Sequence, residues 1–223
     1  PTSGKPGDKA IVTRDGVMVG WIGGSCAQPT VIAQALEALA QDRARLVRIT
    51  PEPGADPPRD GVQEVPMTCF SGGTLEVYIE PQHPRPRLVV VGHLPVAKAL
   101  VHLGAAMSYH TVAVDPETGG TGLDEADQVV TDLAEIPKLI HPSTFVVVAT
   151  HGHYDEPALE KALSAGARYV GLVASPKRTE SVVDHLRRQG VSEEALAALH
   201  APAGLDLGCR RGDEIALSIL AEI

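Results

Sequence analysis

Hydrophobic and polar positions alternate along the second half of the chain in blocks that predict a regular succession of strands and helices. Its short apolar runs, such as Phe145-Val-Val-Val-Ala149, have the pattern of strands buried on both faces of a sheet. The predicted strands are 88–92, 110–115, 145–150 and 168–173, with a weaker one at 128–131, and the predicted helices are 95–107, 156–165, 176–189 and 213–223. This alternation predicts an α/β domain with a parallel sheet and right-handed crossovers. The last helix is apolar nearly all round, so we expect it to be well buried.

The first half of the chain has a different pattern of apolar and polar residues. The dipeptide Asp15-Gly16 separates two short apolar segments and predicts a hairpin, because glycine supplies the positive φ that a tight turn requires. Ile32, Leu36 and Leu39 then repeat at the spacing of an amphipathic helix. The predicted elements, which would form a small α+β layer, are hairpin strands at 10–13 and 17–22, a helix at 29–40, strands at 45–50 and 74–80, and a loop at 51–71.

The boundary between these two patterns is marked by three prolines, Pro81, Pro84 and Pro86. Proline fixes φ and cannot donate a backbone hydrogen bond, so this segment is stiff and irregular. We therefore predict an N-terminal α+β domain at 1–81, a linker at 82–87 and a parallel-sheet α/β domain at 88–223. At 223 residues, the chain is long enough for two such domains.

Composition narrows the possible functions. The formal net charge of −9 argues against a protein that holds nucleic acid, and one Trp and two Phe leave few rings for stacking on bases. Three widely spaced cysteines predict a reducing, cytoplasmic setting and no disulfide framework. No apolar run approaches the roughly 20 residues that cross a bilayer and no signal peptide precedes the first strand, so we expect no membrane insertion. Because Pro1 is not Met, we expect further residues before it.

A glycine turn at residues 89–95 joins a predicted strand to a predicted helix, as in a dinucleotide-binding unit. Gly92 keeps the first position of the usual fingerprint, whereas Leu94 places a side chain where the pyrophosphate would approach. Pro95 suits the first position of a helix but removes a donor from an anion site. Asp115, about 20 residues later, stands where an acid would bind a ribose hydroxyl. A turn that binds no ligand is the alternative.

Two histidines and a carboxylate, His151, His153 and Asp155, follow the predicted strand 145–150. Ligands of open α/β sheets bind at the carboxyl ends of strands, which is where these side chains would gather. They could hold a metal, contact a ligand without a metal, or serve structure, with Asp155 as the N-cap of the next helix. The spacing leaves all three readings open, and we assign no metal.

Ser175, Lys177 and Arg178 begin the predicted helix that follows strand 168–173. A helix N-terminus with nearby cations suits a phosphate. Ser175 also suits a helix cap, and the two roles are compatible.

Cysteines stand beside paired glycines twice in the first domain, in Gly23-Gly24-Ser25-Cys26 and in Cys69-Phe70-Ser71-Gly72-Gly73. A cysteine at a helix N-terminus can have a lowered pKa and become a nucleophile, a sulfur carrier or a metal ligand. Most isolated cysteines are buried small hydrophobes, but two such loops in one small domain favour chemistry. Cys209 has no comparable setting.

Together these residues resemble the xanthine dehydrogenase accessory proteins of the XdhC/CoxI type. The resemblance spans nearly the whole chain, and its motifs are specific as an ordered set. Besides the Gly92 turn, they are Gly20-Trp-Ile-Gly-Gly-Ser-Cys26, Cys69-Phe-Ser-Gly-Gly-Thr-Leu-Glu-Val77, Thr150-His-Gly-His-Tyr-Asp155, Tyr169-Val-Gly-Leu-Val-Ala-Ser175, His200-Ala-Pro-Ala-Gly-Leu-Asp-Leu-Gly208 and Glu214-Ile-Ala-Leu-Ser-Ile-Leu-Ala-Glu-Ile223.

The resemblance implies a small N-terminal domain joined to a Rossmann-like domain. It also implies an accessory factor, more a maturation chaperone than a turnover enzyme, that binds the molybdenum cofactor, molybdopterin. Such a factor promotes sulfuration of the cofactor with a cysteine desulfurase and delivers it to a xanthine dehydrogenase or CO dehydrogenase-like molybdenum hydroxylase apoenzyme. The residues that the resemblance implies for cofactor binding are Gly23, Gly24, Cys26, Cys69, Gly72 and Gly73 in the first domain, and Gly92, His93, Asp115, His151, His153, Asp155, Ser175 and Lys177 in the second.

Two other functions remain open. Gly92 and Asp115 are compatible with an NAD(P)-binding oxidoreductase, although Leu94 speaks against a nicotinamide dinucleotide. The other alternative is a scaffold that docks partner proteins and binds no small molecule. A homodimer is compatible with either.

Overall fold

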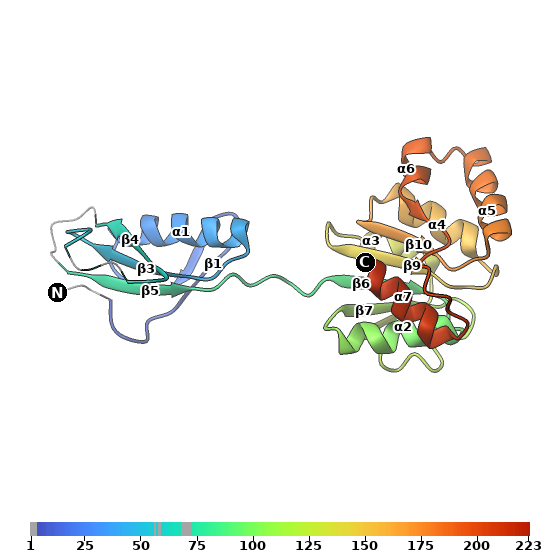
Figure 1. Cartoon of the computed structure of the whole chain (residues 1–223), viewed down its shortest axis with the longest axis horizontal. Helices are drawn as coiled ribbons and strands as arrows, with labels where there is room; N and C mark the ends of the chain where they lie inside the picture. The colour runs from blue at the N-terminus through green and yellow to red at the C-terminus, as the bar shows by residue number, and fades with distance from the viewer. Residues whose placement is uncertain (1–3, 56, 58, 68–72) are drawn as a thin grey trace. The chain divides into compact units, whose positions relative to one another are not determined.

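The computed structural model describes residues 4–55, 57, 59–67 and 73–223. The chain forms two compact units, Pro1–Pro84 and Arg85–Ile223 (Figure 1). The division falls inside segment 82–87, where the prolines prevent regular structure. Among the described residues, no helix is both long and apolar enough to cross a membrane.

The described residues of unit 1 form a three-stranded sheet, one helix and a two-stranded hairpin (Figure 1). Strand β3 is central, parallel to β4 and antiparallel to β5. Val31 and Ala38 of the helix are buried in one core with Val47 and Ile49 of β3. The predicted hairpin, helix and strands at 45–50 and 74–80 are confirmed. The elements are β1 (Ala10–Val12), β2 (Met18–Gly20), α1 (Gln28–Gln41), β3 (Arg45–Thr50), β4 (Val62–Pro66) and β5 (Leu75–Ile79).

Strand β4 lies within segment 51–71, which was predicted to be a loop, so that prediction is wrong for residues 62–66. The strand is short and only partly buried, and it carries little of the apolar alternation that marks a strand. Its place is fixed by parallel pairing with β3 at the edge of the sheet, where Pro66 is tolerated.

Unit 2 contains a six-stranded sheet in which every neighbouring pair is parallel, in the order β11-β10-β9-β6-β7-β8. The strand order reverses between β6 and β9, as at the switch point of the doubly wound nucleotide-binding folds. The predicted α/β class with a Rossmann-like parallel sheet is confirmed. The elements are β6 (Arg87–Val91), α2 (Pro95–Ala106), β7 (His110–Val114), β8 (Gln128–Val130), η1 (Leu133–Glu135), α3 (Ile136–Leu139), β9 (Thr144–Val148), α4 (Asp155–Ser164), β10 (Tyr169–Leu172), α5 (Pro176–Arg188), α6 (Glu193–Ala197), β11 (Leu199–His200) and α7 (Gly212–Glu222).

Alternate residues of the central strands feed two apolar cores, one on each face of the sheet. Leu88 and Val90 of β6 pack with α2 and α7, whereas Val89 and Val91 pack with α3, α4 and α5. Figure 1 shows α2 and α7 side by side on one face and the other long helices on the opposite face. Because both faces are covered, the strands can be apolar throughout.

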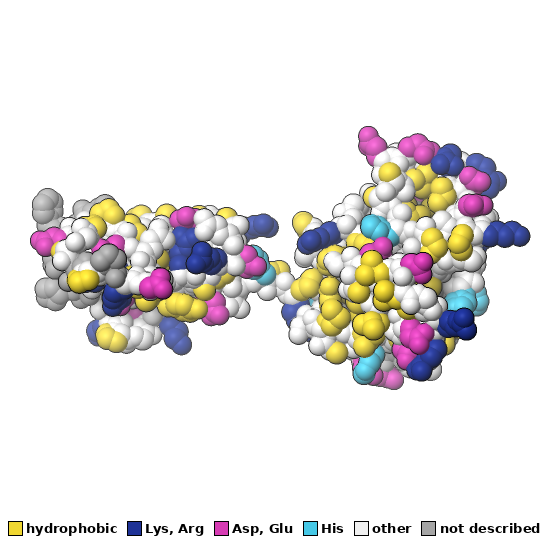
Figure 2. All heavy atoms as spheres, viewed as in Figure 1, with side chains coloured by type: hydrophobic (Ala, Val, Ile, Leu, Met, Phe, Trp, Pro, Cys, Tyr) yellow, Lys and Arg dark blue, Asp and Glu magenta, His cyan; other side chains and the backbone are white. Residues whose placement is uncertain are grey.

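The expectation that the C-terminal helix α7 is well buried holds for one side of the helix. Ala216, Ile219 and Leu220 are buried, whereas Leu217 is 55% exposed. Hydrophobic atoms accordingly gather on the surface over α7 (Figure 2). The short elements η1, α3, α6 and β11 were not predicted, since segments of two to five residues are too short to show a periodicity.

Candidate functional site

The glycine turn after β6 meets the end of β9 backbone to backbone. Gly92 has a φ of +125°, and a Cβ at this position would lie 2.5 Å from the carbonyl oxygen of Ala149. No side chain fits there without moving one of the two strand ends. Gly92 is therefore required by the packing of β6 against β9.

The N-terminus of α2 is covered. Leu94 is its N-cap and makes no capping bond through its side chain, and Pro95 is the first helical residue. Gly212, the first residue of α7, lies directly against this turn, because a Cβ on Gly212 would be 3.3 Å from Pro95 and from the amide nitrogen of Val96. In a dinucleotide-binding domain the pyrophosphate occupies this position. Here α7 takes its place, which argues against the NAD(P) alternative.

Asp115 is fully buried at the end of β7 and holds the loop that follows it. Its carboxylate accepts hydrogen bonds from the backbone amides of Glu117, Thr118 and Gly120 and from the Thr118 hydroxyl, and its Oδ1 lies 3.1 Å from Nδ1 of His93. Burial opposes ionisation, but these hydrogen bonds outweigh it and lower the pKa of Asp115 to about 2. The carboxylate therefore organises the loop and is not exposed to a ribose.

His151 and His153 have different surroundings. His153 Nδ1 lies 3.0 Å from Oε1 of Glu117, on the side of β7, whereas His151 has a φ of +56° and lines a cavity. Within the described part of the chain, no three His, Cys, Asp or Glu side chains are grouped so that they could hold a metal ion. The structure therefore does not bring the two imidazoles into one metal site.

Carboxylates gather around the Tyr154 hydroxyl, near the carboxyl end of β7. Burial raises the pKa of the Tyr154 hydroxyl, and the carboxylates of Asp115, Glu117 and Asp155 raise it further.

Asp155 does not cap α4, so the N-cap reading is wrong. It is the first residue of the helix, and Tyr154 occupies the cap position. The Asp155 carboxylate is buried, accepts a hydrogen bond from Thr150 and pairs with Arg178, whose Nε and Nη2 lie 3.3 Å and 3.2 Å from Oδ2. Arg178 also lies 2.8 Å from Glu156. This ion pair ties the start of α4 to the first turn of α5.

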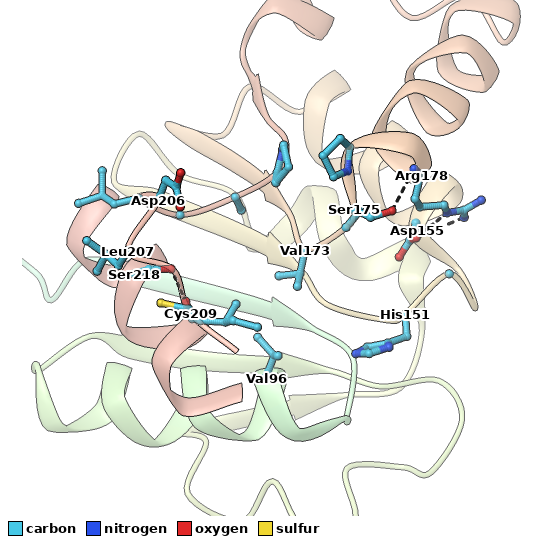
Figure 3. Close-up of a pocket in the computed structure, with 18 residues that line it drawn as sticks. Val96, His151, Asp155, Val173, Ser175, Arg178, Asp206, Leu207, Cys209 and Ser218 are labelled. Carbon is cyan, nitrogen blue, oxygen red and sulfur yellow. Dashed lines mark hydrogen bonds and ion pairs between the residues drawn. The ribbon is translucent and has the colours of Figure 1, made fainter. Parts of the chain in front are cut away.

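A cavity of about 770 Å³ opens between the carboxyl ends of β9 and β10, α7 and the segment 202–209 (Figure 3). At one end lie His151, Asp155, Ser175 and Arg178. Ser175 caps α5 by accepting a hydrogen bond from the Arg178 amide at 3.3 Å, so the first turn of α5 faces this end.

The opposite end of the cavity has a different chemistry. Asp206, Leu207, Cys209 and Ser218 lie there, apart from the Ser175 end (Figure 3). Val96 and Val173 lie between the two ends, and their side chains make the middle of the cavity apolar. The cavity therefore offers an anion-compatible end, an apolar middle and a second polar end.

The sequence predicted only part of this lining. His151, Asp155 and Ser175 line the cavity, whereas Gly92, His93, Asp115, His153 and Lys177 do not. Lys177 is exposed, and its neighbour Arg178 faces the cavity instead. Asp206 and Cys209 were not predicted as site residues. A signal for Asp206 existed, because residues 200–208 form one of the motifs that carry the family resemblance.

The candidate residues of unit 1 are described in part. Gly23 is buried, Gly24 accepts a hydrogen bond from the Ala27 amide, and Cys26 is exposed in the turn that leads into α1. Gly73 precedes β5 and is partly buried. Cys69 and Gly72 lie outside the described residues.

Comparison with known proteins extends these observations. Residues 88–223 match the family described as XdhC Rossmann domain, and residues 1–50 match the XdhC and CoxI family. The chain is 33% identical over 222 residues to YqeB of Escherichia coli (strain K12), an alignment that covers 96% of this chain and 39% of YqeB. It is 29% identical over 158 residues to a protein of Bacillus subtilis (strain 168) that is named as a probable xanthine dehydrogenase subunit, covering 67% of this chain and 46% of that protein.

Two more distant proteins are also similar. The molybdenum cofactor insertion chaperone PaoD of Escherichia coli (strain K12) is 23% identical over 261 residues, which cover 97% of this chain and 77% of PaoD. The crystal structure of a xanthine dehydrogenase from Bacillus halodurans has a similar fold, with a TM-score of 0.54 and 19% identity over 100% of this chain and 88% of that one. The chain spans less than half the length of YqeB and of the Bacillus subtilis protein. From the family match over unit 2, the chain belongs to the XdhC and CoxI family, and residues 88–223 are its XdhC Rossmann domain.

Proposed function

We propose that this chain is an accessory factor that binds the molybdenum cofactor, assists its sulfuration together with a cysteine desulfurase, and helps to insert it into a xanthine dehydrogenase or CO dehydrogenase-like hydroxylase. The family membership and the name of PaoD, a molybdenum cofactor insertion chaperone, support a role in cofactor insertion. The desulfurase and the hydroxylase are the partners that this role requires.

The observation that carries the proposal is the position of the open cavity. In open α/β sheets, ligands bind outside the carboxyl ends of the strands, and the cavity of unit 2 lies at that edge. Its volume of about 770 Å³ is within the range of small-molecule and cofactor sites. The neighbouring dinucleotide position is covered by α7 at Gly212. A ligand other than a dinucleotide therefore has a place to bind.

The Ser175 end of the cavity suits the phosphate of the cofactor. The start of α5 contributes the positive end of the helix dipole, and Arg178 contributes a cation. Arg178 is shared with the carboxylates of Asp155 and Glu156, so the helix dipole supplies the remaining attraction for a phosphate. His151 lines the same end and is a further hydrogen-bonding group there.

In unit 1, we propose that Cys26 and Cys69 with their glycines take part in holding the molybdenum cofactor. Cys26 is exposed in the turn before α1. A thiolate is a soft ligand and a nucleophile, which are the properties that handling molybdenum and sulfur requires.

A pair of matched cap variants tests the cavity assignment. Ser175→Asp keeps an N-cap residue on α5 but adds a negative charge to the cavity, so we expect at least a tenfold loss of bound cofactor. Ser192→Asp makes the same change at the cap of α6, whose serine does not line the cavity, and should behave like wild type. The full chain is purified from a host that makes the cofactor, and molybdopterin is measured as its oxidised fluorescent derivative.

Two outcomes contradict the proposal. Wild-type protein that retains no molybdopterin removes the binding role. Ser175→Asp protein that is folded and retains as much molybdopterin as wild type moves the site out of this cavity.

A further inference from the structure

One carboxylate in the cavity has no strong partner. Asp206 lines the cavity, and the hydrogen bond to its side chain is a long one, 3.4 Å from the Gly208 amide. No ion pair of Asp206 is found among the described residues. The other carboxylate of the lining, Asp155, is 1% exposed and is paired with Arg178 and hydrogen-bonded to Thr150. Asp206 is therefore the carboxylate of this cavity whose oxygens can accept hydrogen bonds from a ligand.

The residues on both sides of Asp206 are apolar and face the same cavity. Leu205 is 46% exposed and Leu207 is 60% exposed, and both belong to the lining. Val173 and Ile215 contribute further apolar surface to the cavity. Large apolar side chains that line a cavity favour a ligand that offers apolar surface as well as polar groups.

The segment that carries these residues is anchored on α7. Gly204 has a φ of +98°, and a Cβ there would lie 2.5 Å from Oγ of Ser218. The Leu205 amide donates to the carbonyl of Ser218 at 3.2 Å. Because Gly204 cannot be replaced without displacing this contact, the start of the segment is fixed and Asp206 is held at the end of the cavity away from Ser175 (Figure 3).

We propose that Asp206 recognises the 2-amino-4-oxopyrimidine edge of a pterin; the assignment to a pterin rests on the proposed function. That edge presents two neighbouring N–H donors in one plane, which match the two oxygens of a carboxylate in a bidentate pair. Leu205 and Leu207 contact the ring, and the phosphate lies toward Ser175 and Arg178. Asp206 is thus a specificity-determining residue for the heterocycle.

Discrimination between two fluorescent heterocycles tests this inference. Lumazine has an oxo group where pterin has its 2-amino group, so it cannot donate both hydrogen bonds to Asp206. We expect the full wild-type chain to bind pterin at least tenfold more tightly than lumazine in a fluorescence titration, because a site built to bind an N–H group rejects a ligand that lacks it. Asp206→Asn should weaken pterin binding at least tenfold and remove the preference, since one side-chain oxygen is replaced by a donor.

The matched control is Asp124→Asn, which changes an exposed aspartate of unit 2 that does not line the cavity. It should bind both heterocycles like wild type. Guanosine carries the same pyrimidine edge, also without a phosphate, and distinguishes the two sources of this chemistry. Weaker binding of the nucleoside than of pterin supports the assignment, and equal or tighter binding overturns it.

The inference is overturned if wild type does not bind pterin, if it binds lumazine as tightly as pterin, or if folded Asp206→Asn keeps the wild-type affinity for pterin. Circular dichroism and the Tm establish that the variant is folded. The molybdopterin retained by the same preparations separates this inference from the proposed function. Retention by wild type and Asp206→Asn alike, with no change in pterin affinity, removes only the role of Asp206.

Discussion

Helices α2 and α5 begin with similar residues, but the N-terminus of α2 is covered by another helix and that of α5 is accessible. Each follows a buried parallel strand, and each has a proline as its first helical residue, Pro95 in α2 and Pro176 in α5. The start of α2 is capped by Leu94 and covered by Gly212 of α7, whereas the start of α5 is capped by Ser175 and faces a cavity of about 770 Å³. The same local motif is therefore closed at one position of the sheet and open at another.

The two helix starts show that a Rossmann-like fold offers more than one place for a ligand, and that packing decides which of them is accessible. In this strand order, the turn between β6 and α2 is the usual place for a dinucleotide. The packing of α7 on α2 fills that place, and the open space lies at the end of β10. Resemblance to a dinucleotide-binding fold therefore does not identify the ligand, because the ligand depends on which helix start is accessible.

We expect the largest loss of stability from a substitution in the turn between β6 and α2. Gly92→Ala places a Cβ 2.5 Å from the carbonyl oxygen of Ala149 at a φ of +125°, so we expect the free energy of unfolding to fall by about 3 kcal/mol or more. Gly119→Ala is the control: its φ is +68°, but no atom lies within 4 Å of the added Cβ, and a loss of about 1 kcal/mol is expected. Urea unfolding measures both variants. Equal losses would mean that the contact with β9 is not what requires glycine.

We expect a smaller loss of stability, which depends on pH, from the loop that Asp115 holds after β7. The pKa of Asp115 is lowered to about 2, below its ordinary value near 3.9 in an unfolded chain. Its contribution to stability, about 2 kcal/mol, is therefore present above about pH 4 and is lost as the pH falls toward 2. Urea unfolding from pH 7 down to the lowest pH at which the wild type stays folded should show this loss.

Asp115→Asn should be less stable than wild type at pH 7 and should lose less stability between pH 4 and 2. Asp124→Asn, an exposed control, should keep the wild-type slope. An identical pH dependence in wild type and Asp115→Asn would mean that the hydrogen bonds to this carboxylate do not hold the loop 116–120.

The fold was predictable where a local pattern was sufficient. The apolar runs of β6 and β9 and the helical spacing of α2 and α5 are visible in the sequence, and the structure confirms them. Strand β4 and the two-residue β11 were missed, because their places depend on pairing with distant strands. The exposed side of α7 was missed for a similar reason: composition alone does not show which stripe of an apolar helix faces its partner.

Three of the predicted residues, His151, Asp155 and Ser175, lie in the loops or helix starts that follow β9 and β10, and all three line the cavity. His93 and Asp115 follow β6 and β7 but do not line it. The sequence did not distinguish Lys177 from Arg178, because adjacent helical residues point about 100° apart and the rotation of α5 is set by packing. Asp206 comes from a segment whose place depends on the contact between Gly204 and Ser218, which no local pattern reveals.

The smallest expected effect is the most direct test of the comparison. We expect no saturable change in NADH or NADPH fluorescence with the full chain at ligand concentrations up to about 1 mM, which excludes binding stronger than about 4 kcal/mol. Leu94→Gly restores the second glycine of the dinucleotide fingerprint and removes the leucine side chain from the N-cap of α2. If Leu94 alone closed the site, this variant would bind NADH. Because Gly212 still covers Pro95 and the amide of Val96, we expect Leu94→Gly protein, shown by circular dichroism to be folded, to remain without NADH binding. Saturable NADH binding by this variant would mean that α7 does not close the start of α2, and the two helix starts would then differ by one side chain.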